Sequence, residues 1–267
     1  MAETLFDQIQ EDAKALKFDL SVQEIALLSK EKNFSDASLQ AIEAALGYLS
    51  KKKKEATIET LLRMSRLPKK EPKTFENFDF SFIHGKDVEL LKNLPTLSSL
   101  YAHKNLAFIG PQGVGKTHLA MAFGHECCLH GLKAYYLKAS ELNDRFTRAR
   151  KNDKTASVVN GLVKPSCLII DEIGRCIFDE ANTRMFFDVV DRRNEKEGAN
   201  CMIYTSNKQP NVWRDYFSED DSLLCALDRI FDDATVYNIK GKSYRGRKLK
   251  TVALEAGDTE QQPRPEE

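Results

Sequence analysis

Apolar residues recur at helical spacing through the first 67 residues of the chain. The apolar face of the first predicted helix consists of Leu5, Ile9, Ala13 and Leu16. Ser21 and Glu24 fit the capping-box pattern that starts many helices. Asp36 is expected to cap a third helix, which continues through the four lysines at 51–54. Residues 1–67 are therefore predicted to form a small all-helical domain that binds DNA or a partner protein.

Beyond residue 82 the pattern changes to short apolar runs with helical stretches between them. The predicted strands are 106–109, 134–137, 168–170, 202–205 and 235–239. Strands that alternate with helices are typical of an α/β domain with a mostly parallel sheet. This domain is predicted to span residues 82–250, and a polar, acidic and disordered tail is expected over 251–267.

Residues 68–81 are predicted to link the two domains. The stretch 68–80 holds two prolines, which argue against a packed helix or strand, and three phenylalanines. Those aromatic side chains either dock on the following domain or flank a nucleotide base, and docking is the more common fate of such residues.

The net charge is zero, but this value averages over local blocks of opposite sign. Residues 51–73, the basic block, hold nine Lys or Arg against three Glu, and residues 240–250 hold six Lys or Arg and no acid. Residues 251–267 hold five acidic residues against one Arg. A local basic block is suited to nucleic acid, although a solvated helix face is an equally open interpretation.

Several classes of protein are disfavoured by the sequence. No apolar stretch approaches the length of a membrane span, and the mixed, acidic start does not resemble a signal peptide, so a cytoplasmic protein is expected. The six cysteines form no Cys-x-x-Cys pair, so neither a zinc site nor a disulfide framework is predicted.

Residues 110–117 fit the pattern G-x-x-x-x-G-K-[ST] between a predicted strand and a predicted helix. This phosphate-binding loop consists of Gly110, Pro111, Gln112, Gly113, Val114, Gly115, Lys116 and Thr117. Its glycines let backbone N–H groups curl around phosphate oxygens, and the following helix N-terminus adds a favourable dipole. We expect Lys116 to contact the β and γ phosphates and the Thr117 hydroxyl to bind Mg²⁺. A chain of this length matches by chance roughly 1% of the time.

A second apolar run ends in two acids, Asp171 and Glu172. At the tip of a strand beside the phosphate-binding loop, Asp171 can hold Mg²⁺ through water. Glu172 can then orient or deprotonate the attacking water. Such a run is a weak signal alone, but its position after a complete phosphate-binding loop predicts a site that hydrolyses the triphosphate.

Two further polar residues are candidates for catalysis. Asn207 follows a predicted strand, where it can hydrogen-bond the attacking water or the γ-phosphate, although Asn is also common in ordinary turns. Arg229 precedes the last predicted strand and can contact a neighbouring subunit's γ-phosphate. An intramolecular pair with Asp228, Asp232 or Asp233 is an equally weighted alternative for Arg229.

The order of these elements resembles AAA+ ATPases of the initiator and helicase-loader branch, and more closely the IstB family. IstB proteins are helper ATPases encoded beside the IstA transposase in one class of bacterial insertion sequence. The resemblance covers roughly residues 40–250. The segments that carry it are 63–68, 73–80, 110–117, 168–172, 205–207, 227–229 and 241–245.

The resemblance implies a role for each candidate residue. Lys116 and Thr117 take the Walker A roles, and Asp171 and Glu172 take the Walker B roles. The remaining roles are a first sensor at Asn207, a trans-acting arginine finger at Arg229, and a sensor or subunit contact at Arg245. It also implies ATP as the nucleotide and a three-layer αβα AAA+ domain. Only 22 residues follow Arg245, so no C-terminal helical lid is expected, in agreement with the IstB and DnaC groups.

The family also implies a mechanism and partners. ATP-bound subunits form a homo-oligomer on double-stranded target DNA, bend it largely without regard to sequence, and present it to an IstA-like transposase. Hydrolysis then resets the assembly. A DnaC-like loader that acts on a replicative helicase is the alternative function, because amphipathic helices also bind proteins. A copy that binds nucleotide without turnover is disfavoured by the intact catalytic residues.

Two basic stretches are candidates for contacting DNA phosphates without reading bases. In the basic block these residues are Lys51, Lys52, Lys53, Lys54, Arg63 and Arg66. A helix opened by Ser140 places Arg145 and Arg148 close to one face. A solvated helix is the open alternative for the second stretch.

Overall fold

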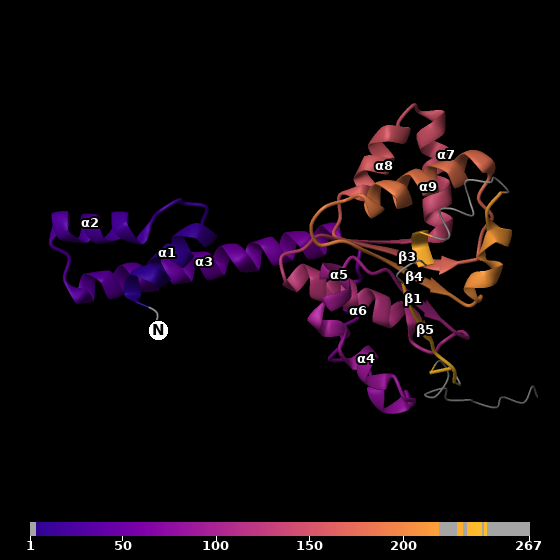
Figure 1. The fold of residues 1–267 in the computed structure, drawn as a ribbon, viewed down its shortest axis with the longest axis horizontal. Helices are drawn as coiled ribbons and strands as arrows, with labels where there is room; N and C mark the ends of the chain where they lie inside the picture. The colour runs from indigo at the N-terminus through magenta and orange to yellow at the C-terminus, as the bar shows by residue number, and fades with distance from the viewer. Residues whose placement is uncertain (1–3, 219–228, 232–233, 242, 245–267) are drawn as a thin grey trace, which may run out of the picture.

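The structure is a computed structural model that describes residues 4–218, 229–231, 234–241 and 243–244. Figure 1 shows a helical N-terminal part that extends away from a domain built around a sheet. The long helix α3 (Asp36–Met64) joins the two parts. Its first half packs with α1 (Leu5–Ala15) beside α2 (Val22–Lys32), and its last turns contact the sheet domain.

Polar caps start the N-terminal helices. Ser21 and Glu24 form the predicted capping box at α2. Ser35 caps α3, so the expectation that Asp36 does so was wrong by one position. Asp36 instead occupies the first turn, where a negative charge interacts favourably with the helix dipole. The buried core of this helical part is small and consists of Ile9, Ile25 and Leu39.

Within the described residues, five parallel strands form one sheet in the order β2-β3-β4-β1-β5. The strands are β1 (Leu106–Ile109), β2 (Ala134–Lys138), β3 (Cys167–Ile173), β4 (Cys201–Ser206) and β5 (Thr235–Asn238). The bounds of β1 agree with the prediction, whereas β3 continues past the two acids that were expected at its tip. The predicted parallel sheet is confirmed.

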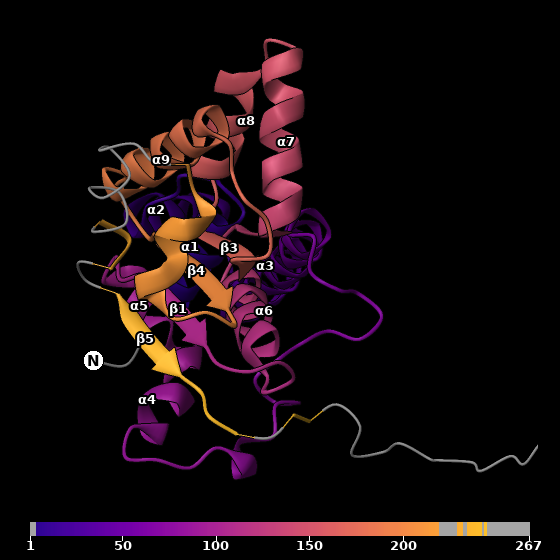
Figure 2. The ribbon, with the colours of Figure 1, turned by 90° about the vertical axis from the view of Figure 1, so that its right-hand side faces the viewer.

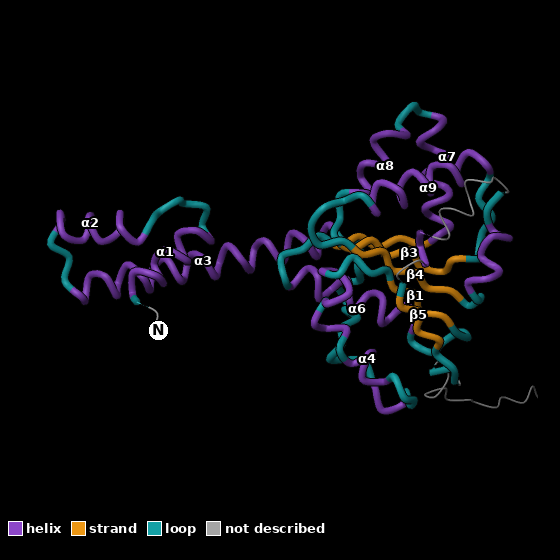
Figure 3. The backbone as a smooth tube through the Cα atoms, in the orientation of Figure 1, coloured by secondary structure: helices purple, strands orange, loops and turns teal. Residues whose placement is uncertain are grey.

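Helices cover both faces of this sheet, which gives the expected three layers (Figures 1, 2 and 3). One face packs against α7 (Ala139–Lys151), α8 (Thr155–Val163) and α9 (Glu180–Asn194). The other face packs against α6 (Lys116–Leu129) and the short helices α4 (Val88–Lys92) and α5 (Ser98–Tyr101). Alternate residues of β1 serve the two faces, with Ala107 in the first core and Phe108 in the second.

The predicted linker follows the end of α3 and packs against the sheet domain. Phe75 and Phe78 are buried in the α6-side core, and Phe80 packs against that core from η1 (Phe80–Phe82). The docking interpretation of these phenylalanines is therefore confirmed. The remaining 3-10 helices are η2 (Leu94–Thr96) and η3 (Pro210–Tyr216).

The expectations for the C-terminal end lie outside the described residues. They concern Arg245, the acidic tail over 251–267 and the lack of a helical lid. Among the helices that the structure describes, none combines the length and apolar character that a membrane crossing requires.

Candidate active site

The phosphate-binding loop connects the end of β1 to the start of α6, as the sequence predicted. Gly113 and Gly115 have φ angles of 78° and 97°, a left-handed conformation that favours glycine. Neighbouring groups also exclude side chains here. A Cβ atom on Gly113 would lie 1.9 Å from the Ser243 hydroxyl, and one on Gly115 would lie 2.7 Å from the Phe78 ring. The backbone at both positions therefore requires glycine.

Lys116 lies in the first turn of α6 with only 7% of its surface exposed. Its ammonium donates hydrogen bonds to the carbonyl oxygens of Gly110 (2.8 Å) and Pro111 (2.7 Å). A third hydrogen bond of 2.7 Å goes to the side-chain oxygen of Asn207, which follows β4. The structure therefore brings together two residues that the sequence nominated separately.

Asp171 is buried and accepts hydrogen bonds from three hydroxyl groups. Thr117 donates to one carboxylate oxygen (2.8 Å), and Thr205 donates to the same oxygen. Tyr136 donates to the other oxygen (2.7 Å). Burial, followed by the negative charge of Asp171, raises the pKa of Tyr136, so its hydroxyl stays protonated as a donor. Sequence reasoning missed Tyr136 and Thr205, although Thr205 lies in the polar strand end that contains Asn207.

The oxygen donors of Thr117 and Asp171 suit Mg²⁺, which binds one or two protein oxygens together with phosphates and water. No group of three or more His, Cys, Asp or Glu suited to a metal occurs among the described residues. A divalent ion at this pair would therefore take its other ligands from the nucleotide and from water.

Glu172 lies in an irregular part of β3. The pairing of β3 with β4 shifts register between Ile170 and Ile173, and Glu172 has a φ of 63°, which is unusual for a residue with a side chain. The Thr205 hydroxyl accepts a hydrogen bond of 2.9 Å from the backbone N–H of Glu172. The two acids have different surroundings, because hydroxyl groups contact Asp171 whereas cations contact Glu172.

Two cations contact the Glu172 carboxylate. Arg175 forms a hydrogen-bonded ion pair with one oxygen, and the Lys138 ammonium lies 3.6 Å from the other. Partial burial acts to raise the pKa of Glu172, but the hydrogen bond from Arg175 and the charge of Lys138 outweigh it, so the pKa is lowered. Neither cation was predicted as a site residue, because Lys138 belongs to another strand and the contact with Arg175 depends on the irregular backbone at Glu172.

Arg229 lies near the amino ends of the strands, whereas the phosphate-binding loop lies at their carboxyl ends. It lines a small cavity with Asn105 and Met202, which lie at the amino ends of β1 and β4. The phosphate-binding loop follows the carboxyl end of β1. Arg229 also forms an ion pair with Asp191 of α9, a partner that the sequence interpretation did not consider. Its own chain's phosphate-binding loop is therefore not its neighbour.

The structure brings some of the candidate DNA-contacting residues together and leaves others apart. Lys51–Lys54 lie on α3 between the helical N-terminal part and the sheet domain, and Lys52 pairs with Glu55. Arg66 and Arg145 instead meet at the ring of Tyr135, 5.9 and 5.6 Å from its centroid.

Two more candidates are exposed on the helices α3 and α7. Arg63 is exposed in the last turn of α3. Arg148 is exposed one turn after Arg145 on α7, where it donates a hydrogen bond to the carbonyl of Asp144.

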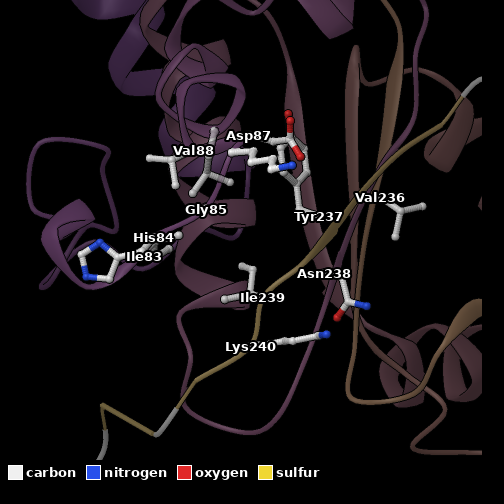
Figure 4. Close-up of a pocket in the computed structure, with 12 residues that line it drawn as sticks. Ile83, His84, Gly85, Asp87, Val88, Val236, Tyr237, Asn238, Ile239 and Lys240 are labelled. Carbon is white, nitrogen blue, oxygen red and sulfur yellow. The ribbon is translucent and has the colours of Figure 1, made fainter.

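A cavity of about 370 Å³ lies beside the phosphate-binding loop. Figure 4 shows that its lining comes from residues 83–88 on one side and from 236–240 on the other. Ile239 connects the cavity to the loop, because its carbonyl oxygen would lie 2.1 Å from a Cβ atom on Gly110. Sequence reasoning did not nominate these residues, since they come from segments about 150 positions apart.

The segment before Arg245 lies against the same loop. The Tyr244 backbone N–H donates a hydrogen bond of 2.9 Å to the carbonyl of Gly113, beside the Ser243 hydroxyl. Arg245 itself lies outside the described residues. Two residues of the motif that contains it, Ser243 and Tyr244, thus lie against the phosphate-binding loop.

A three-layer domain with this strand order and a lysine, threonine and acidic pair at the carboxyl ends of its strands is a P-loop domain of the AAA+ type. The family described as IstB-like ATP binding protein matches residues 12–252. The chain belongs to this family.

Two relatives support the assignment. The chain is 35% identical to the ATP-binding protein of insertion sequence IS5376 from Geobacillus stearothermophilus, over 73% of this chain and 76% of that protein. It is 34% identical to the ATP-binding protein of insertion sequence IS21 from Pseudomonas aeruginosa, over 70% of this chain and 69% of that one.

Solved structures share the fold at lower identity. AMPPCP-bound DnaA from Aquifex aeolicus superimposes with a TM-score of 0.51 at 24% identity, over 63% of this chain and 50% of that one. DnaI superimposes with a TM-score of 0.51 at 18% identity, over 70% and 93% of the two chains. The chain thus spans about half of the DnaA chain, and these similarities concern the fold alone.

Proposed function

We propose that this chain binds ATP with Mg²⁺ at residues 110–117 and hydrolyses it. The observation that carries the proposal is the convergence of Lys116, Thr117, Asp171 and Asn207 at the carboxyl ends of three neighbouring strands. Lysine, hydroxyl, carboxylate and amide groups at one such edge are the set that phosphoryl transfer uses.

Each residue has a distinct task in this proposal. Lys116 exchanges the carbonyl oxygens that it now contacts for β and γ phosphate oxygens. Glu172 accepts a proton from the attacking water, and Asn207 orients that water or the γ-phosphate. Thr117 and Asp171 would hold Mg²⁺, which would neutralise part of the phosphate charge when bound.

The cavity beside Gly110 is proposed to receive the nucleoside. Its volume of about 370 Å³ and its mixed lining of apolar side chains and backbone groups are typical of small-molecule pockets. The segment that includes Ile83 and Gly85 faces Ile239 across it (Figure 4). A base bound here would leave its phosphates directed toward the adjoining loop.

Arg229 is proposed to complete the site of a neighbouring subunit. It lies at the amino ends of the strands, whereas its own chain's loop follows their carboxyl ends. Subunits stacked with one face against the next would bring this guanidinium to the neighbour's γ-phosphate, where an arginine stabilises transition-state charge. Its present partner Asp191 would release it on assembly.

We further propose the domain division 1–67, 68–81, 82–250 and 251–267, with duplex DNA contacted by the basic residues of α3 and α7. The relatives above 30% identity are named as ATP-binding proteins of insertion sequences, which supports a role in transposition with an IstA-like transposase. We propose that the chain acts in the cytoplasm. No observation favours a helicase loader as the second candidate function, because the similarity to DnaI concerns the fold alone.

The direct experiment is a phosphate-release assay on the purified chain with ATP, with and without Mg²⁺. The proposal expects Mg²⁺-dependent release that a non-hydrolysable ATP analogue inhibits and GTP inhibits weakly. No release under any condition, with or without duplex DNA, would reject the enzymatic part. A tightly bound but unhydrolysed nucleotide would restrict the proposal to binding.

A further inference from the structure

The two carboxylate oxygens of Asp171 have different partners. Oδ1 accepts a hydrogen bond of 2.8 Å from the Thr117 hydroxyl and a second hydrogen bond from the Thr205 hydroxyl. Oδ2 accepts a hydrogen bond of 2.7 Å from the Tyr136 hydroxyl. Asp171 is only 2% exposed, so these hydroxyl groups, and not bulk water, decide which of its oxygens can reach a metal ion.

The Tyr136 hydroxyl is held firmly in place. Tyr136 lies on β2, which pairs with β3, the strand of Asp171. Its ring is buried in the core on the α6 side of the sheet. Its backbone N–H donates a hydrogen bond of 2.8 Å to the carbonyl of Ser65, which directly follows α3. A packed ring on an anchored backbone has little freedom to move, so its hydroxyl stays at Oδ2 of Asp171.

This arrangement leaves Asp171 with a single oxygen for a metal ion. With Oδ2 bound to Tyr136, only Oδ1 is available, on the side of the Thr117 hydroxyl. Mg²⁺ suits such a site, because it demands near-ideal octahedral geometry and binds through one or two carboxylates together with phosphates and water. Ca²⁺ takes roughly 6–8 oxygens in a flexible arrangement and accepts both oxygens of one carboxylate. The hydrogen bond from Tyr136 denies Ca²⁺ that second oxygen.

We propose that Tyr136 is a positioning residue that sets the metal specificity of the site, because its hydroxyl restricts Asp171 to one oxygen and so favours Mg²⁺ over Ca²⁺. The inference rests on the proposed function, in which Thr117 and Asp171 hold the ion beside the phosphates. Tyr136 acts through Asp171 and is not itself a metal ligand.

Thr205 provides a comparison within the same site. Its hydroxyl donates to Oδ1 of Asp171 and accepts a hydrogen bond of 2.9 Å from the Glu172 backbone N–H. Thr205→Val therefore removes one hydroxyl donor from Asp171 but leaves Oδ2 bound to Tyr136. A general weakening of the site and a loss of metal specificity thus give different results in Thr205→Val and Tyr136→Phe.

The test measures the affinity of a fluorescent, non-hydrolysable ATP analogue for wild type, Tyr136→Phe, Thr205→Val and Tyr204→Phe. Each protein is titrated with excess Mg²⁺, with excess Ca²⁺ and with EDTA, and a thermal melt establishes that it is folded. Phenylalanine at position 136 keeps the buried ring and removes only the hydroxyl. Tyr204 is the matched control, because it is a buried tyrosine on β4 whose hydroxyl contacts the sulfur of Met202 and not Asp171.

Wild type is expected to bind the Mg²⁺ complex of the analogue more tightly than the Ca²⁺ complex. Tyr136→Phe binds the Mg²⁺ complex about tenfold more weakly or worse, since loss of the partner behind a metal ligand costs roughly 10–100-fold. Its affinity for the Ca²⁺ complex changes by less than about threefold, because the freed Oδ2 offers Ca²⁺ a further ligand. Affinity in EDTA stays at the wild-type value. Thr205→Val keeps the wild-type ratio of the two affinities, and Tyr204→Phe behaves as wild type throughout.

Three results would overturn the inference. A wild type without preference for Mg²⁺ over Ca²⁺ leaves no specificity to assign. Equal changes in the two affinities of Tyr136→Phe, or no change in either, show that Tyr136 does not set the specificity. A Thr205→Val variant that loses the preference as fully as Tyr136→Phe shows that the hydrogen bond to Oδ2 is not its cause. Failure of the proposed function is distinct, since wild type would then bind the analogue no more tightly with Mg²⁺ than in EDTA.

Discussion

The Lys116 ammonium donates a hydrogen bond of 2.7 Å to the side chain of Asn207, which lies 91 residues further along the chain. Lys116 begins α6 and Asn207 follows β4, so this bond depends on the pairing of β1 with β4. A triphosphate that binds here must replace the present partners of Lys116 with phosphate oxygens. The pair therefore links the phosphate-binding residue to the residue expected to sense the γ-phosphate.

Lys116→Ala is expected to abolish ATP binding, because it removes the ammonium that pairs with the β and γ phosphates. Fluorescent-nucleotide titration would measure this, with an expected loss of about 100-fold or more in affinity. Lys196→Ala is the matched control, since Lys196 also donates to two backbone carbonyls, those of Lys164 and Pro165, but lies outside the site. Equal affinities for Lys116→Ala and wild type would refute the site assignment.

Glu172→Gln is expected to bind ATP normally but to hydrolyse it about 10²-fold more slowly or worse, because an amide does not accept the proton from water. Its complexes with DNA are also expected to persist longer, if hydrolysis resets the assembly as the family resemblance implies. Single-turnover phosphate release and DNA dissociation rates would measure both effects. Glu180→Gln, which alters another exposed carboxylate paired with arginine, is the control. Normal turnover by Glu172→Gln would exclude this residue as the base.

Arg229→Ala is expected to leave ATP binding intact and to reduce turnover by about 10³-fold or more, as loss of a trans-acting arginine does. The sharper test mixes Arg229→Ala with Lys116→Ala. A pair of neighbours with one intact loop and one intact arginine recovers activity only if the arginine acts between subunits. Arg192→Ala is the control, because Arg192 pairs with Asp188 on the same helix as Asp191. No recovery in the mixture would argue against action between subunits.

Replacing Lys51–Lys54 with glutamine is expected to weaken duplex binding and to flatten its dependence on salt. The slope of log K against log salt is negative, and each lost phosphate contact reduces its magnitude by about 0.9. The loss of four contacts would therefore reduce the magnitude by up to about 3.6. The control replaces four lysines of the N-terminal helices, namely Lys14, Lys17, Lys30 and Lys32. An unchanged slope would show that the lysines at 51–54 do not contact phosphates.

Much of the site could be predicted because its residues lie at or just after the carboxyl ends of strands. The bounds of β1 and the phosphate-binding loop come from local pattern, and the carboxyl ends of parallel strands meet at one edge, which brings Asp171 and Asn207 to Lys116. The motif also predicts a helix directly after the loop, and α6 begins at Lys116.

Other features could not be predicted because they depend on an irregular backbone or on distant segments that the fold brings together. The pairing of Glu172 with Arg175 and Lys138 requires the irregular backbone at Glu172 and the end of an edge strand. The cavity between residues 83–88 and 236–240 requires two segments that share no local signal. The cap of α3 was misassigned because Ser35 and Asp36 are both good capping residues.

We propose that ATP bound at residues 110–117 drives assembly of this chain on duplex DNA. Sedimentation analysis or electron microscopy with duplex DNA, with and without a non-hydrolysable ATP analogue, tests it most directly. The account predicts large complexes on DNA only when the analogue is present, and none with Lys116→Ala. Complexes of the same size with and without the analogue would contradict it.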